Sequence, residues 1–139
     1  MFKKLATCSL AILLFLLTYG IQTIESQEDY SYLLGIWESK SGSFTSEITI
    51  KEIFAIDNKA VVFVKWPENS SSRGRIPAGS YEVNNALFKP GPEPVIEYKS
   101  PTSGNEQYLK FNRNGTGTIK SVTGKGGEWG TITGDLKKK

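Results

Sequence analysis

The chain has 139 residues, of which 38% are hydrophobic and 22% are charged, with one cysteine and no histidine. This composition is typical of a globular protein with a single domain, and it excludes disordered, collagen-like and disulfide-rich chains. The formal net charge of +3 is too small to indicate a nucleic acid or another polyanion as the partner. We therefore expect no nucleic-acid binding.

Residues 1–26 have the pattern of a secretory signal peptide. Lys3 and Lys4 stand ahead of an apolar run at 10–17, in the order that such signals require. Small residues allow cleavage near position 20 or after position 26. We expect this segment to be removed.

An uncleaved membrane anchor is the alternative, because residues 5–24 carry no charge and are about long enough to cross a bilayer. Both interpretations place the rest of the chain outside the cytoplasm, since the lysines stay on the cytoplasmic side. The predicted location is therefore secreted or periplasmic, without stable membrane insertion after cleavage.

Residues 27–136 are predicted to form one folded domain, which we expect to be monomeric. They contain no cysteine, so in an oxidising compartment their stability must come from a packed core, which a chain of this length can supply. The last three residues, 137–139, are all lysine. We expect them to form a solvated basic tail.

The domain is predicted to be all-β. Short segments of alternating or β-branched residues recur between Gly, Pro, Asn and Asp, and no clean helical period extends beyond about ten residues. The predicted strands lie at 36–39, 44–54, 60–66, 80–83, 86–88, 95–100, 107–112, 117–123 and 129–136.

The segment 44–54 has the alternation of a strand with one side in water. The segment 60–66 is apolar on both faces, as expected for a central strand, and we assign its Phe63 to the core. The residues that share the predicted inner face of the first of these segments are Phe44, Ser46, Ile48, Ile50 and Phe54.

Tight turns connect the predicted strands. The pairs at 57–58, 84–85 and 114–115 consist of Asp, Asn and Gly, which tolerate the positive φ of short hairpins. Sequential strands should therefore pair as an antiparallel up-and-down meander. Eight to nine such strands avoid exposed edges by closing into a small barrel. A sandwich would need long crossovers, for which only 67–77 and 89–94 are candidates.

Residues 33–37 have the sequence Leu-Leu-Gly-Ile-Trp. This segment resembles the Gly-x-Trp opening of lipocalin-like barrels. The resemblance implies that Gly35 lets the chain enter the first strand and that Trp37 plugs the closed end of the barrel. It also implies a basic residue near the last strand that stacks on this tryptophan, a position that falls to Lys137 or its neighbours.

A broader likeness covers residues 33–138. After the Gly-x-Trp it includes Ile-Thr-Ile-Lys-Glu-Ile at 48–53, Ala-Val-Val-Phe-Val-Lys-Trp at 60–66, and Asn-Gly-Thr-Gly-Thr at 114–118 followed by Gly-Asp-Leu-Lys at 134–137. The whole looks like the small exported barrel domains of bacteria, whose role is largely uncharacterised. The likeness implies a fold and a compartment, and no site.

The residue types exclude most catalytic chemistry. Without histidine, and without cysteine after residue 26, the domain lacks the usual general base, the usual zinc ligands and the thiol nucleophile. Carboxylate pairs such as Glu93 and Glu97 fit ordinary surface positions, and no acidic loop has calcium-binding spacing. We expect no metal, no cofactor and no catalytic residue, and we predict that the protein is not an enzyme.

The candidate ligand-binding residues gather around one long connection, the loop 67–78. The chain leaves a predicted strand at Trp66 and returns near Tyr81, and both side chains combine an apolar body with a polar tip. The loop itself contains Arg73 and Arg75, whose charges could meet an acidic group. We expect these four residues to lie at the same end of the barrel and to form the recognition surface.

Two functions fit these expectations. The first is a non-catalytic binding module that holds a small amphipathic, apolar or carbohydrate ligand in the mouth of the barrel. The second is a protein-interaction module, an inhibitor or accessory subunit of an exported enzyme, that uses the loop 67–78. A lined cavity near Trp66 and Tyr81 would favour the first function, and a closed core with a protruding rigid loop would favour the second.

Overall fold

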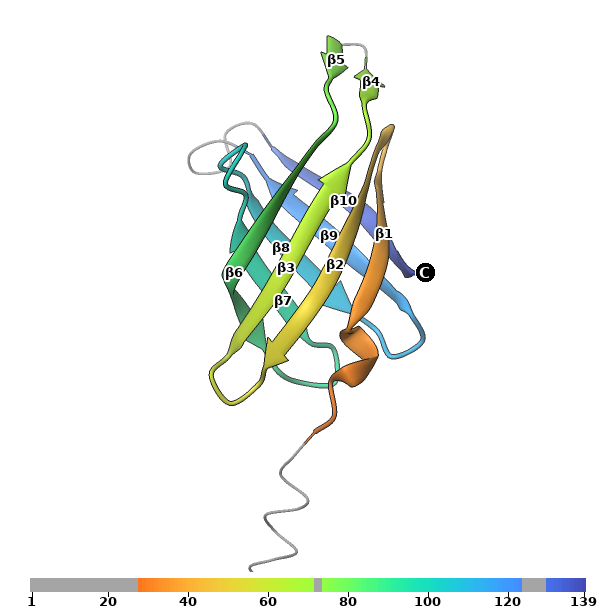
Figure 1. Cartoon of the computed structure of the whole chain (residues 1–139). Coiled ribbons are helices and arrows are strands. Elements are labelled where there is room, and N and C mark those ends of the chain that lie inside the picture. The colour runs from red at the N-terminus through yellow and green to blue at the C-terminus, as the bar shows by residue number, and fades with distance from the viewer. Residues whose placement is uncertain (1–27, 72–73, 124–129) are drawn as a thin grey trace, which may run out of the picture.

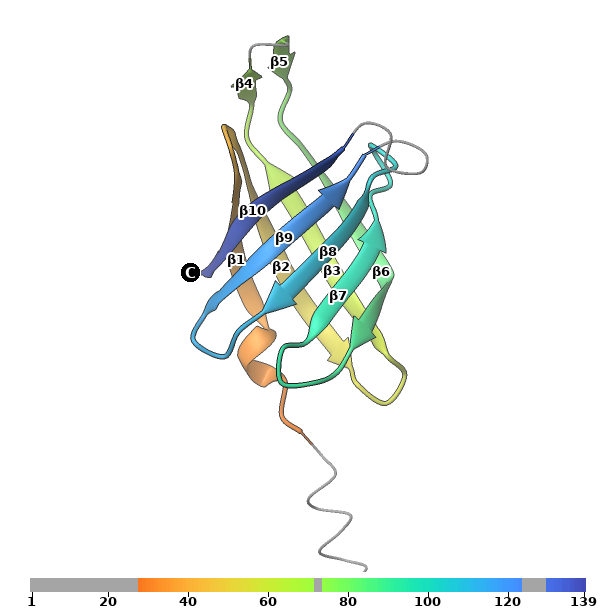
Figure 2. The ribbon, with the colours of Figure 1, turned by 180° about the vertical axis from the view of Figure 1, so that it is seen from behind.

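The strands curl into a closed barrel (Figures 1 and 2). The computed structural model describes residues 28–71, 74–123 and 130–139. Its elements are the 3-10 helix η1 (Ser31–Leu33) and the strands β1 (Gly35–Ser41), β2 (Phe44–Phe54), β3 (Lys59–Trp66), β4 (Asn69–Ser71), β5 (Gly74–Ile76), β6 (Gly79–Lys89), β7 (Val95–Lys99), β8 (Glu106–Phe111), β9 (Thr116–Val122) and β10 (Thr131–Lys138).

Eight of these strands form the barrel, in the order β1-β10-β9-β8-β7-β6-β3-β2, and every neighbouring pair is antiparallel. The predicted all-β, up-and-down barrel is therefore confirmed. The loop predicted between β3 and β6 contains the short hairpin β4–β5, which projects beyond one end of the barrel (Figure 1).

Two of the three predicted asparagine turns close hairpins. Asn58 has a φ of 50° in the turn between β2 and β3, and Gly115 has a φ of 82° in the turn between β8 and β9. Asparagine and glycine enter this left-handed region more readily than other residues do. The turn chemistry that the sequence predicted at these two places is confirmed.

The third asparagine pair, at 84–85, forms a β-bulge and not a turn. Both of its residues lie opposite the single residue Val61 of β3, which is the arrangement of a bulge. The extra residue changes the alternation, so that Val83 before it and Ala86 after it both face the core. The single strand β6 therefore replaces the two predicted strands 80–83 and 86–88.

A second bulge overturns the prediction that Phe54 faces the interior. The register of β2 against β3 shifts between Ile50 and Glu52, and one extra residue reverses which side chains point inward. Ile53 therefore packs against the core, while Phe54 is 42% exposed.

Phe63 is not in the core, contrary to the prediction. The alternate residues Ala60, Val62 and Val64 of β3 are buried, whereas Phe63 is half-buried between them on the other face. Because both faces of this strand are apolar, its composition alone does not determine which face turns inward.

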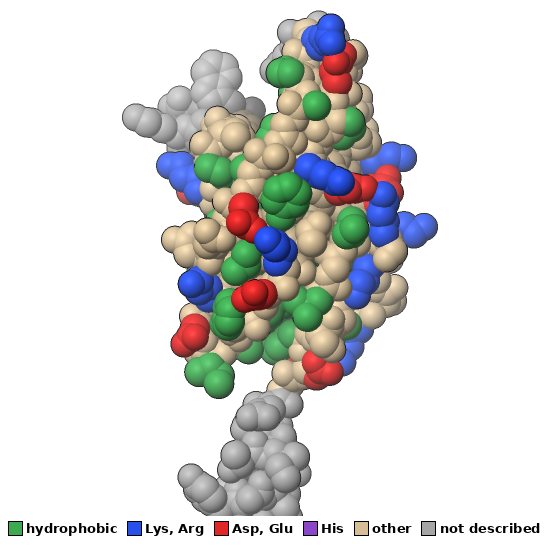
Figure 3. Space-filling view, viewed as in Figure 1, with side chains coloured by type: hydrophobic (Ala, Val, Ile, Leu, Met, Phe, Trp, Pro, Cys, Tyr) green, Lys and Arg blue, Asp and Glu red, His purple; other side chains and the backbone are tan. Residues whose placement is uncertain are grey.

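Ion pairs between strands, some across an intervening strand, cover the outer surface, where Figure 3 shows acidic and basic side chains next to each other. The Lys51 Nζ lies 2.7 Å from Glu82 Oε1, and the Lys89 Nζ lies 2.7 Å from Glu97 Oε1. Exposed pairs of this kind contribute at most about 1 kcal/mol each. The stability of the barrel therefore rests mainly on its interior.

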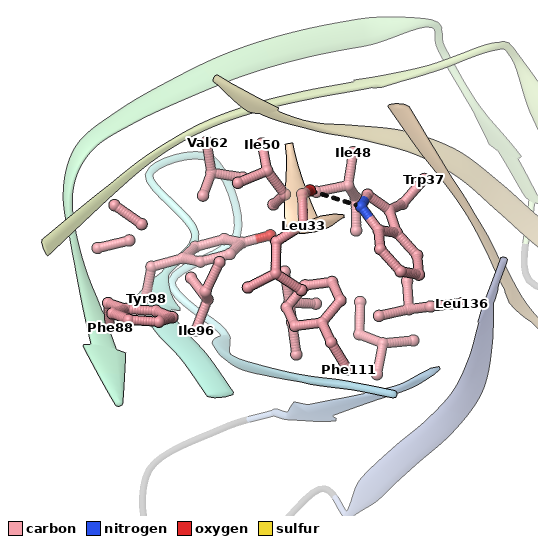
Figure 4. Close-up of a cluster of buried hydrophobic side chains, with 14 of the residues drawn as sticks. Leu33, Trp37, Ile48, Ile50, Val62, Phe88, Ile96, Tyr98, Phe111 and Leu136 are labelled. Atoms are coloured by element: carbon pink, nitrogen blue, oxygen red, sulfur yellow. Dashed lines mark hydrogen bonds between the residues drawn. The ribbon is translucent and has the colours of Figure 1, made fainter. Parts of the chain in front are cut away.

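Trp37 closes one end of the barrel, as the resemblance implied (Figure 4). Its side chain is fully buried, and its Nε1 donates a hydrogen bond of 2.9 Å to the carbonyl oxygen of Leu33 in η1. The indole meets the ring of Phe111 edge-on, with 4.9 Å between the ring centroids. The helix, the first strand and the eighth strand are thus packed around one side chain.

Residues 137 and 138 belong to β10 and do not form the predicted tail. Lys138 lies opposite Trp37 in the register, and its Nζ donates a hydrogen bond of 2.6 Å to the carbonyl oxygen of Tyr32. It occupies the place that the resemblance gives to a basic residue. Lysine can lay its hydrocarbon stem along a protein surface while its ammonium reaches a polar partner. Three successive lysines in the sequence suggest a solvated tail and do not reveal this packing.

We predict that Trp37→Ala destabilises the protein severely. Truncation of a buried tryptophan costs about 3–5 kcal/mol, a large part of the 5–15 kcal/mol that holds an ordinary domain together. Urea unfolding measures the effect, and Trp37→Phe, which keeps an aromatic ring but loses the hydrogen bond to Leu33, should be milder. A stable Trp37→Ala protein would show that this side chain does not close the barrel.

We predict that deletion of Asn84 is far more harmful than Asn84→Ala. Deletion removes the bulge, and a shift of one residue sends one half of β6 to the wrong face of the sheet. The substitution keeps the number of residues. Thermal unfolding should give a much lower melting temperature for the deletion alone, and equal values for both variants would contradict the role of the bulge.

Candidate functional site

The end of the barrel opposite Trp37 contains an open cavity of about 470 Å³, within the size range of small-molecule sites. We call this open end the mouth, and the β4–β5 hairpin rises beside it (Figure 1). All eight barrel strands contribute to the cavity. Its lining residues are Ser39, Ser41, Phe44, Ser46, Ile48, Val64, Trp66, Ile76, Tyr81, Tyr98, Ser100, Thr102, Ser103, Asn105, Gln107, Ile119, Ser121 and Ile132.

The inward-facing residues change from apolar to polar toward the mouth. On β1 the buried Trp37 is followed two residues later by Ser39, and on β2 the buried Ile48 is preceded by Ser46. The same change from an apolar to a polar residue, two positions nearer the mouth, occurs on β8, on β9 and directly after β7. The polar side chains at this step, which we call the polar belt, are Ser39, Ser46, Ser100, Gln107 and Ser121.

Three aromatic residues on the adjacent strands β3, β6 and β7 form another part of the lining, which we call the aromatic wall: Trp66, Tyr81 and Tyr98. The Trp66 and Tyr81 ring centroids lie 5.7 Å apart, and those of Tyr81 and Tyr98 lie 6.2 Å apart. The two predicted residues Trp66 and Tyr81 are therefore neighbours at the mouth. Tyr98 extends the wall toward the core, where it is 8% exposed.

The backbone of β6 fixes the position of Trp66. Its Nε1 donates a hydrogen bond of 3.0 Å to the carbonyl oxygen of Pro77. Gly79 lies opposite Trp66 in the register, and a Cβ at this glycine would come within 2.5 Å of the indole Cζ2. Only glycine leaves space for the indole here, so the ring rests directly on the strand.

The tyrosines of the aromatic wall are held in their neutral form. The Tyr81 and Tyr98 hydroxyl oxygens lie 3.4 Å apart. Burial raises the pKa of Tyr98 well above its ordinary value of 10.0, with a further contribution from Tyr81, and burial also raises the pKa of Tyr81. Both side chains present uncharged hydroxyl groups at neutral pH.

Two hydroxyl groups of the polar belt have no partner among the described residues. Ser39 is 3% exposed and Ser46 is 7% exposed, and the two lie opposite each other on β1 and β2. By contrast, Gln107 Nε2 donates a hydrogen bond of 2.9 Å to Ser121 Oγ. Because both residues line the open cavity and neither hydroxyl is bonded to a described residue, the serine pair is available for a hydrogen bond with a bound molecule.

The described lining of the cavity contains no charged side chain. Its polar groups are hydroxyls and amides, which donate or accept hydrogen bonds without carrying charge. An ion bound in this cavity would lose its hydration without gaining a counter-charge, which is costly. The chemistry of the site therefore suits a neutral molecule.

The two predicted arginines differ from the aromatic residues in their placement. Arg75 is exposed on β5, where its guanidinium pairs with the Glu68 carboxylate, and it does not line the cavity. Arg73 lies outside the described residues. From this hairpin Ile76 reaches the mouth, and the Asn69 Oδ1 accepts a hydrogen bond from the Thr45 N–H.

A second groove lies beside the ends of β1, β2 and β3, with a volume of about 450 Å³. Three of its charged groups are paired, because the Glu47 carboxylate contacts the ammonium groups of both Lys65 and Lys139. Hydrogen bonds from these lysines, first from Lys139, lower the pKa of Glu47. Glu38 also lines the groove and forms no ion pair among the described residues, and of the aromatic wall only Trp66 borders this groove.

The sequence analysis singled out Trp66 and Tyr81, which line the cavity, and did not single out the polar belt. A signal was present, because Ser46 falls on the predicted inner face of 44–54 between Phe44 and Ile48. A polar residue at an inward position of a strand indicates a lined cavity when it recurs on several strands. The recurrence becomes visible only when the inward positions of all the strands are aligned.

Comparisons with protein-family models, with curated proteins and with solved structures found no match for this chain. Within the described ranges, no cluster of three or more His, Cys, Asp or Glu side chains is arranged to hold a metal ion. The same ranges contain no helix long and apolar enough to span a membrane. Any functional conclusion rests on the fold and on the cavity.

We predict that the protein loses stability as the pH rises above about 10, and that Tyr98→Phe reduces this loss. The unfolded chain releases the tyrosine proton near pH 10, whereas burial keeps it on folded Tyr98 at higher pH, so the free energy of unfolding falls through this range. Urea unfolding at several pH values measures the slope. Tyr108→Phe is the comparison and should change the slope less, because the pKa of Tyr108 is raised first by a surface hydrogen bond with Glu106 and not by deep burial. An equal slope for wild type and Tyr98→Phe would contradict the prediction.

Proposed function

We propose that the protein is a non-catalytic binding module that holds a small neutral molecule in the mouth of its barrel. The observation that carries this proposal is the open cavity of about 470 Å³, whose lining combines an aromatic wall with uncharged polar groups. Cavities of this size with apolar walls and a few polar groups are typical of sites for small molecules.

The distribution of polarity inside the barrel supports binding over a purely structural role. A barrel that served only as a scaffold would gain from apolar side chains at the inward positions of Ser39 and Ser46, which could extend the packed core toward this end. Departures from the rules of core packing are expected at functional sites. The serine pair is such a departure, and it faces the cavity.

The proposed setting is outside the cytoplasm. The signal pattern of residues 1–26 supports export, and the following residues contain no cysteine that oxidation could alter. The second predicted function, contact with another exported protein through the loop 67–78, would use the projecting hairpin. A ligand-binding role of Arg73 and Arg75 stays a prediction for that hairpin.

We predict that the neutral dye N-phenyl-1-naphthylamine binds in the mouth, and that 8-anilino-1-naphthalenesulfonate binds at least about tenfold more weakly. The two dyes share one aromatic skeleton and differ by a sulfonate group, which finds no counter-charge in the cavity. Dye fluorescence during titration gives both dissociation constants. Lack of binding by the neutral dye, or equal binding of the two dyes, would contradict the proposed function.

Two aromatic variants locate the dye. Trp66→Ala removes part of the aromatic wall and should weaken binding of the neutral dye. Phe63→Ala is the matched control, because Phe63 lies on the same strand and faces away from the cavity. If Phe63→Ala weakened binding as much as Trp66→Ala, the dye would be bound outside the mouth.

A further inference from the structure

The two unpartnered hydroxyls lie on one side of the cavity. Ser39 and Ser46 are directly opposite each other in the β1–β2 register, so their side chains are adjacent on the inner surface. Both line the cavity, and both are more than nine-tenths buried. A ligand in the mouth can therefore receive or donate two neighbouring hydrogen bonds at this place.

The aromatic wall begins on β3, the strand next to that of Ser46, and continues over β6 to β7 on the far side of the barrel. In the ring of eight strands, β7 lies four positions from β1, and β3 lies four positions from β9. Tyr98 therefore stands across the barrel from Ser39, and Trp66 stands across from Ser121. A molecule in the mouth therefore meets the Trp66 ring beside the serine pair and the Tyr98 ring across the barrel from it.

The rim of the mouth is apolar. Ile76 is 40% exposed and Ile132 is 52% exposed, although both are large aliphatic residues. Both also belong to the lining of the cavity. An apolar substituent that extends from a ring in the polar belt would cover these two side chains and remove their surface from water.

We infer that the ligand is a neutral molecule with a hydroxylated ring and an apolar substituent, of which an alkyl glycoside is an example. The C–H face of the ring packs on Trp66 and Tyr81, its hydroxyls bond to Ser39 and Ser46, and the substituent lies along the rim. This inference rests on the proposed function and names its ligand class.

The alternatives leave groups of the site unsatisfied. A purely apolar ligand would expel water from the serine pair and offer no hydrogen bond in return, which weakens its binding. An anionic ligand would face a lining without positive charge. A hydroxylated ring satisfies the serines and the aromatic wall together.

The test is calorimetric titration of the full chain with hexyl β-glucoside and with hexyl β-glucuronide. The second compound replaces the terminal CH₂OH of the sugar by a carboxylate and is otherwise the same. We expect binding of one equivalent of the glucoside and at least about tenfold weaker binding of the glucuronide. Absence of glucoside binding, or equal affinity for both compounds, would overturn the inference.

The double variant Ser39→Ala with Ser46→Ala tests the hydrogen bonds. It should weaken glucoside binding about tenfold or more, because each lost hydrogen bond contributes about 0.5–1.5 kcal/mol. Binding of the neutral naphthylamine dye should not weaken, since the dye does not need this serine pair. Ser80→Ala is the matched control, because Ser80 is exposed on β6 and does not line the cavity.

These measurements distinguish failure of the proposed binding function from failure of the inferred ligand class. If the dye binds in the mouth and the glucoside does not, the protein is a binding module for another class of ligand and only the inference fails. If the double serine variant binds the glucoside as tightly as wild type does, the assigned hydrogen bonds are wrong. The melting temperature of the variant verifies its folding, and we expect no decrease because the removed hydroxyls had no protein partner.

Discussion

Closure of the barrel between β1 and β10 is the constraint on which the rest of the structure depends. Only four residue pairs join these strands. A Cβ at Gly134 would lie 2.3 Å from the carbonyl oxygen of Lys40, so glycine permits this close approach. Trp37, which is anchored to Leu33, holds the other end of β1 in place. Closure leaves the barrel without a free edge and turns one face of every strand away from solvent.

The two bulges decide what the closed barrel contains. Each adds one residue to a strand and thereby reverses the alternation of inward and outward side chains. The bulge in β6 lets Ala86 face the apolar core while Tyr81, on the other side of the bulge, faces the cavity. Without it, one half of this strand would turn its apolar residues to solvent.

The interior is divided into a part that stabilises the fold and a part that is suited to binding. Near Trp37 the inward residues are apolar and fully buried, and they pack against one another. Toward the mouth, Ser39 and Ser46 line the open cavity, and their hydroxyls form no hydrogen bond within the described part of the chain. This division supports the proposal that a ligand completes the polar end of the barrel.

The sequence by itself determined the all-β class, the closed meander and the plug at Trp37, because alternation, turn residues and a local motif are properties of neighbouring residues. It also placed Trp66 and Tyr81 at one end. Only the tertiary structure decided that Phe54 and Phe63 face outward and that the four serines and the glutamine of the polar belt meet at one level. Register, bulges and closure set these relations between residues far apart in the chain, and a local pattern carries no information about which strands lie across the barrel from each other.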